Sequence, residues 1–120
     1  MKAKILNALN SQTPRSAWGK GVRDAAIDLL TDCEPDTVIT KEYLLNGAAN
    51  WSEYSYGGCA SIYDAQIAEQ YCNPSELKRC KGGELMPNRD ETWLDLQARA
   101  LWQAARLILR EARIQTMINK

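Results

Sequence analysis

The chain has 120 residues, of which 45% are hydrophobic and 25% are charged, and its formal net charge is zero. This size and balance suit a single domain over residues 1–120. Neutrality favours neither a nucleic-acid nor a membrane partner. The chain contains no histidine, which excludes Ser–His and Cys–His nucleophile pairs and histidine-ligated metals.

Other motifs that carry chemistry are also missing from the sequence. No glycine-rich phosphate loop and no C-x-x-C pair occurs among the four cysteines, so neither nucleotide binding nor a structural zinc site is expected. We therefore expect no enzyme, no cofactor and no metal. The segment Met1–Leu9 has no signal-peptide core, and no apolar run approaches the roughly 20 residues of a membrane helix. A cytoplasmic protein with reduced cysteines and no membrane partner is expected.

The first half of the chain predicts three helices. They are expected over Lys2–Leu9, from about Ser16 to Thr31, and from about Lys41 to Gly47. In the second helix, apolar residues recur at spacings of three and four, which places them on one face: Trp18, Val22, Ala25, Ala26, Leu29 and Leu30. The β-branched run Thr37–Thr40 has no second strand to pair with, so it is interpreted as an extended linker.

The second half predicts three more helices. Cys59–Tyr71 has helical spacing. Asn73-Pro74-Ser75-Glu76 is typical of a helix start, and this short helix is expected to end near Cys80. The longest helix should run from about Glu91 to Met117. The sequence thus predicts an all-α, single-domain orthogonal bundle of about six helices with a long C-terminal helix.

The long helix carries a stripe of charged and aromatic residues. At 100° per residue, six side chains fall within roughly 80° of one another: Asp95, Arg99, Trp102, Arg106, Arg110 and Arg113. Leucine, isoleucine and alanine residues on the far side should face the core: Leu94, Leu101, Ala104, Ala105, Leu107 and Ile108.

Two interpretations of this stripe remain open. In the first, it is a solvated helix face whose arginines pair with acids such as Asp24 and Asp28, and Trp102 is partly buried under an arginine stem. In the second, it binds phosphate groups or an acidic protein, because arginine offers a fork of donors and stacks on aromatic rings.

A second candidate region is the aromatic loop around EYSYGGCASIYD, residues Glu53–Asp64. Trp51, Tyr54 and Tyr56 could fill the space between two helices, with Cys59 small and buried, or these four residues could wall a small pocket. A nucleophilic role for Cys59 is disfavoured, because the chain supplies no histidine base.

Four stretches carry a resemblance to a known family: AWGKGVRDAAIDLL, LLNGAANWSEYSYGGCASIYD, IAEQYCNPSELKR and ETWLDLQARALWQAARLI. Over roughly Ser16 to Arg110, the chain resembles a family of small uncharacterised proteins from plasmids, prophages and integrative elements of gut Firmicutes and Actinobacteria. The resemblance implies a bacterial, cytoplasmic protein of mobile-element ancestry. It assigns no catalytic or binding residue.

Taken together, these features favour a non-enzymatic helical binding module. The leading hypothesis is a mobile-element accessory protein that acts through contact with another protein, for example as a defence inhibitor or small regulator. One alternative is nucleic-acid binding through Arg99, Trp102, Arg106, Arg110 and Arg113. The other is small-ligand binding at the aromatic loop. The sequence leaves the oligomeric state open.

Overall fold

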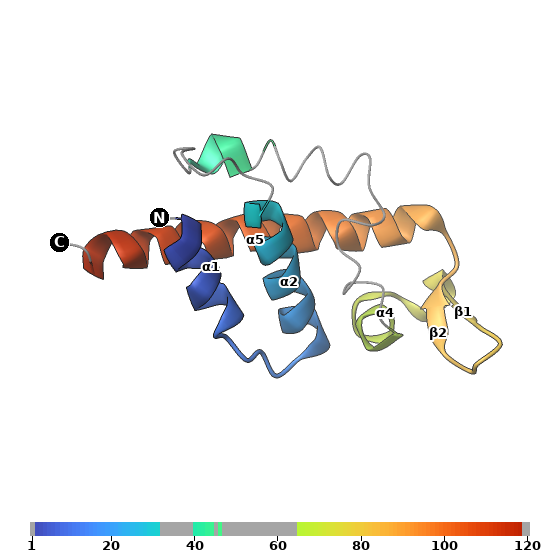
Figure 1. Ribbon diagram of the computed structural model, residues 1–120. Helices are drawn as coiled ribbons and strands as arrows, with labels where there is room; N and C mark the ends of the chain where they lie inside the picture. Colours follow the sequence, from blue (N-terminus) through green and yellow to red (C-terminus); the bar gives the residue numbers. More distant parts are fainter. Residues whose placement is uncertain (1, 32–39, 45, 47–64, 119–120) are drawn as a thin grey trace.

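The structure is a computed structural model, and it describes residues 2–31, 40–44, 46 and 65–118. Its elements are α1 (Lys2–Asn10), α2 (Ala17–Thr31), α4 (Ala65–Tyr71), a 3-10 helix (Pro74–Glu76), β1 (Leu77–Arg79), β2 (Leu85–Pro87) and α5 (Asp90–Ile118). Residues 41–44 and 46 are also helical. Figure 1 shows α5 as a long spine, with α1 and α2 packed across one part and α4 near its N-terminal part.

Helix α2 follows the predicted pattern closely. Ser16 caps its start, because the Ser16 Oγ accepts a hydrogen bond of 2.9 Å from the Gly19 backbone N–H. All of the apolar residues expected on its inner face are buried: Trp18, Val22, Ala25, Ala26, Leu29 and Leu30. The three- and four-residue spacing therefore identified the core face of this helix.

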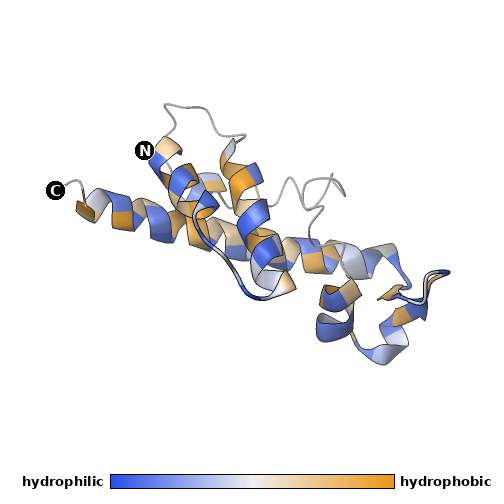
Figure 2. Ribbon diagram, turned by 60° about the horizontal axis from the view of Figure 1, so that its bottom comes forward, coloured by the Kyte–Doolittle hydropathy of each residue, from blue (hydrophilic) through white to orange (hydrophobic). Residues whose placement is uncertain are grey.

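Helix α5 supplies the other wall of the core. Six of its residues belong to the buried cluster: Leu96, Ala100, Leu101, Ala104, Ala105 and Ile108. Leu94 and Leu107, also expected on this side, are half-buried. The alanines let α2 approach α5 closely, and Ile5 and Leu9 of α1 complete the packing. Figure 2 shows hydrophobic residues alternating with hydrophilic ones along the helices.

The segment after Tyr71 corrects the prediction of an all-helical chain. The helix expected from Asn73 to Cys80 is wrong: only Pro74–Glu76 is helical, as a single 3-10 turn, and β1 and β2 follow as an antiparallel hairpin. The six-helix count is accordingly not confirmed. The described residues are nevertheless mostly helical, and the long C-terminal helix is present.

The hairpin has a clear physical origin. The expected start signal is present, since the Asn73 N–H donates to the Glu76 Oε1 at 2.9 Å. The chain then reverses direction in a turn that contains Gly83. The φ of Gly83 is 87°, a backbone conformation that favours glycine. The Arg79 guanidinium closes the loop by donating to the Gly83 carbonyl at 2.8 Å. In the resulting hairpin, Lys78 lies opposite Met86.

Two further expectations concern other parts of the chain. The extended linker over Thr37–Thr40 and the aromatic loop lie almost entirely outside the described residues, which include only Thr40 from these segments. Among the described residues, no helix combines the length and the apolar character needed to cross a membrane.

Candidate binding surface on α5

The stripe predicted from the helical wheel lies on the exposed side of α5. Arg99, Trp102, Arg106, Arg110 and Arg113 are all exposed. At a rise of 1.5 Å per residue, the Cα atoms of Arg99 and Arg113 lie about 21 Å apart along the axis. We call these five residues the arginine stripe. Its length is suited to contact with an extended segment or a flat surface of another macromolecule.

The arginines of the stripe have no acidic partner in the described part of the chain. The ion pairs there join Arg23 to Asp24 at 3.0 Å and Arg89 to Glu91 at 3.7 Å. Asp24, a candidate partner for the stripe, forms its ion pair in this set with its sequence neighbour Arg23. Among the described residues, internal pairing therefore does not neutralise the stripe.

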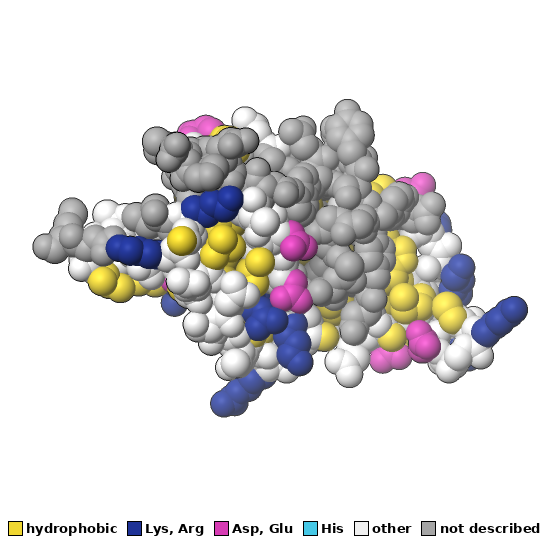
Figure 3. Space-filling view, in the orientation of Figure 1, with side chains coloured by type: hydrophobic (Ala, Val, Ile, Leu, Met, Phe, Trp, Pro, Cys, Tyr) yellow, Lys and Arg dark blue, Asp and Glu magenta, His cyan; other side chains and the backbone are white. Residues whose placement is uncertain are grey.

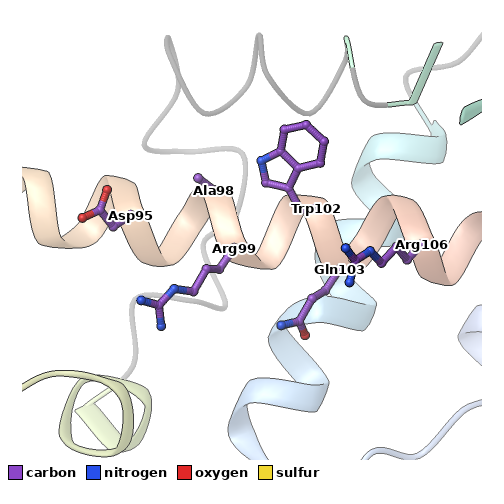
Figure 4. A pocket seen from close by; sticks show the side chains of 6 residues that line it. All are labelled: Asp95, Ala98, Arg99, Trp102, Gln103 and Arg106. Atoms are coloured by element: carbon purple, nitrogen blue, oxygen red, sulfur yellow. The ribbon is translucent and has the colours of Figure 1, made fainter. Parts of the chain in front are cut away.

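Trp102 differs sharply from the core tryptophan of α2. Trp102 is 43% exposed, whereas Trp18 is 8% exposed. In Figure 4, the Trp102 ring projects from α5 on the side opposite Arg99 and Gln103. The ring is therefore not covered by the Arg99 stem, although the side chain as a whole is still partly buried. It is a large aromatic surface left available to a partner.

Trp18 connects the core to Gln103, which neighbours the stripe residue Trp102 on α5. The sequence patterns did not single out Gln103. The Trp18 Nε1 donates a hydrogen bond of 2.9 Å to the Gln103 Oε1. The Trp18 ring also packs on Tyr71, with ring centroids 4.5 Å apart and planes tilted by 36°. Gln103 is exposed, yet its amide oxygen is anchored to a buried and well-supported side chain.

Two adjoining hollows lie along this part of α5. The first, of about 460 Å³, is lined by Asp95, Ala98, Arg99, Trp102, Gln103 and Arg106. The second, of about 260 Å³, lies between α2 and α5 and is lined by Val22, Gln103, Arg106, Leu107 and Arg110. Gln103 and Arg106 belong to both. The lining of the first hollow is polar and apolar in similar measure, whereas the second is mainly apolar, with a floor of Val22 and Leu107.

The C-terminal end of α5 adds apolar surface next to the stripe. Met117 and Ile118 are 69% and 68% exposed, and Ile114 is exposed as well. Figure 3 shows basic and hydrophobic side chains next to one another along this end of α5. A surface that mixes arginine with exposed apolar groups is typical of protein–protein contacts.

The described cysteines give no sign of a reactive or metal-binding site. Burial, followed by the charge of Glu76, raises the pKa of the Cys72 thiol, and the nearby Arg99 opposes this only in part. Cys72 is therefore mainly a neutral thiol near pH 7, which makes it a poor nucleophile. In the described part of the chain, no group of three or more Cys, Asp or Glu side chains could hold a metal ion. The candidate pocket residues Trp51, Tyr54, Tyr56 and Cys59 lie outside the described residues.

Comparisons with known proteins add no relative. No protein-family model, curated protein or solved structure matches the chain. The functional argument therefore rests on the geometry of α5.

Proposed function

We propose that this protein is a non-enzymatic binding module that holds an acidic surface of another protein against the arginine stripe of α5. The observation that carries the proposal is the exposure of four arginines without acidic partners among the described residues. Guanidinium groups in this state are ready to pair with carboxylates, and arginine and tryptophan are the residues that most often dominate protein interfaces.

The surroundings of the stripe favour a protein partner over nucleic acid. Ile114, Met117 and Ile118 are exposed near the C-terminal end of the same helix. They offer nothing to phosphates but can pack against apolar groups of a protein. The proposed role as an accessory protein of a mobile element rests on the sequence resemblance alone.

Affinity capture with matched charge variants tests the proposal. Wild-type protein, an Arg106→Ala/Arg110→Ala variant and a Lys78→Ala/Lys81→Ala variant would be immobilised and exposed to a lysate of the native cells. Both variants remove two positive charges from exposed positions, but only the first alters the stripe. We expect a protein that wild type and the lysine variant retain equally, and that the arginine variant retains at least about tenfold less, since charge-assisted hydrogen bonds contribute about 1.5–3 kcal/mol each.

Equal recovery on all three proteins would contradict a role for the stripe. So would equal loss on both variants, because that result would reflect net charge rather than position. Quantitative mass spectrometry of the retained proteins distinguishes these outcomes.

Nucleic-acid binding remains the second candidate, since it is favoured by the same four arginines, which have no acidic partner among the described residues. Duplex DNA binding through four phosphate contacts would weaken with salt at a slope of about −3 to −4 in log–log form, and Arg106→Ala would reduce that slope by about one. We expect instead no mobility shift near physiological salt. A shift at that salt, lost in a folded Arg106→Ala variant, would replace the protein-binding proposal.

A further inference from the structure

Gln103 stands at the centre of the exposed surface, because it lines both hollows together with Arg106. In Figure 4, its side chain extends toward α2 and lies between those of Arg99 and Arg106. The two hollows therefore meet at one amide and one guanidinium group.

The orientation of the Gln103 amide is fixed by its partner. An indole N–H can only donate a hydrogen bond, so the atom that faces the Trp18 Nε1 at 2.9 Å must be the Gln103 oxygen. The Nε2 group then points elsewhere, and it makes no hydrogen bond within the described part of the chain. Because Trp18 is buried and packed on Tyr71, this donor is held in place before any ligand arrives, which lowers the entropic cost of binding.

The groups around this donor define the chemistry that it can bind. Arg99 and Arg106 supply only donors and positive charge, which suits a negatively charged oxygen. Asp95, in the same hollow, disfavours an additional negative charge. These features select a singly charged carboxylate over a phosphate dianion. The neighbouring floor of Val22 and Leu107 suits an apolar side chain next to that carboxylate.

We propose that Gln103 and Arg106 form the specificity site of the arginine stripe, which recognises an acidic residue adjacent to an apolar residue in the partner protein. The carboxylate binds between the Gln103 Nε2 and the Arg106 guanidinium, and the apolar side chain enters the hollow between α2 and α5. This inference rests on the proposed function and names the feature of the partner that the stripe selects.

A model peptide tests the site directly. Side-chain NMR signals of Gln103, Trp18 and Trp102 would be followed while N-acetyl-glutamyl-leucinamide is added at constant ionic strength. N-acetyl-glutaminyl-leucinamide serves as the uncharged control, and inorganic phosphate as the control for a simple anion. We expect saturable shifts at Gln103 with the glutamyl peptide, and binding of the glutaminyl peptide and of phosphate at least about tenfold weaker.

The substitution Gln103→Glu separates binding from folding. A glutamate keeps an oxygen that can accept the Trp18 hydrogen bond, but it replaces the Nε2 donor with a negative charge. Gln115→Glu is the matched control, because it makes the same change about 18 Å further along the same helix. We expect glutamyl-peptide binding to fall at least about tenfold in Gln103→Glu and to stay unchanged in Gln115→Glu.

Several results would overturn the inference. They are equal binding of the glutamyl and glutaminyl peptides, equal or tighter binding of phosphate, and unchanged peptide binding in Gln103→Glu. Affinity capture of the partner protein distinguishes a failure of the specificity site from a failure of the proposed function. A captured protein that depends on Arg106 and Arg110 but not on Gln103 would refute only the specificity site. Absence of any stripe-dependent protein would refute the function itself.

Discussion

Replacing Trp18 with alanine is expected to lower the free energy of unfolding by about 3–5 kcal/mol, the usual cost of removing a large buried aromatic side chain. Trp18 is 8% exposed, and its ring contacts Tyr71 while its Nε1 bonds Gln103. The substitution would remove packing between α2, α4 and α5 at once. Equilibrium denaturation in urea measures the change.

Trp102→Ala is the matched control, since it removes the same side chain from a position that is 43% exposed. Its cost should stay within about 1 kcal/mol, because substitutions at exposed positions rarely destabilise more. Trp18→Phe adds a finer comparison: it removes the bond to Gln103 and part of the ring packing, so its cost should exceed about 1 kcal/mol and stay below that of Trp18→Ala. Equal losses for Trp18→Ala and Trp102→Ala would contradict the assignment of one tryptophan to the core and the other to the surface.

The second large effect is expected at the contact between α2 and α5. Leu101 is fully buried in the core cluster, and Leu101→Ala should cost about 2–5 kcal/mol because the cavity left behind can close only in part. Met117→Ala, on the same helix at a position that is 69% exposed, should change the free energy of unfolding by no more than about 0.5 kcal/mol. The same denaturation experiment measures both, and a cost below 1 kcal/mol for Leu101→Ala would show that α5 does not bury this face.

The sequence predicted the parts of the fold that local patterns determine. The core faces of α2 and α5 follow from the spacing of their apolar residues, and the exposure of the arginine stripe follows from the helical wheel. The hairpin was missed because the signal at Asn73–Glu76 marks only where a helix can begin. Whether a helix continues beyond Glu76 depends on the turn at Gly82-Gly83 and on pairing between Leu77–Arg79 and Leu85–Pro87. Helical periodicity contains no information on either.

The candidate site was predictable only in part. The positions of the arginines on one face could be read from their spacing. Their lack of acidic partners in the described part of the chain could not, since pairing depends on the three-dimensional neighbours. No pattern in the sequence marked Gln103 as a site residue. Its significance comes from Trp18, which lies 85 residues away in the chain, and from the hollow that α2 forms against α5.

Photo-crosslinking from position 102 tests the central claim most directly. A photoreactive phenylalanine derivative would replace Trp102, an exposed residue of the stripe, and separately Lys78 on the hairpin, which is also exposed. After irradiation in native cells, the account predicts a protein adduct from position 102 that survives nuclease treatment and disappears when Arg106→Ala/Arg110→Ala is added. No such adduct should form from position 78. An adduct removed by nuclease, or one formed equally from both positions, would contradict the claim that α5 holds an acidic protein partner.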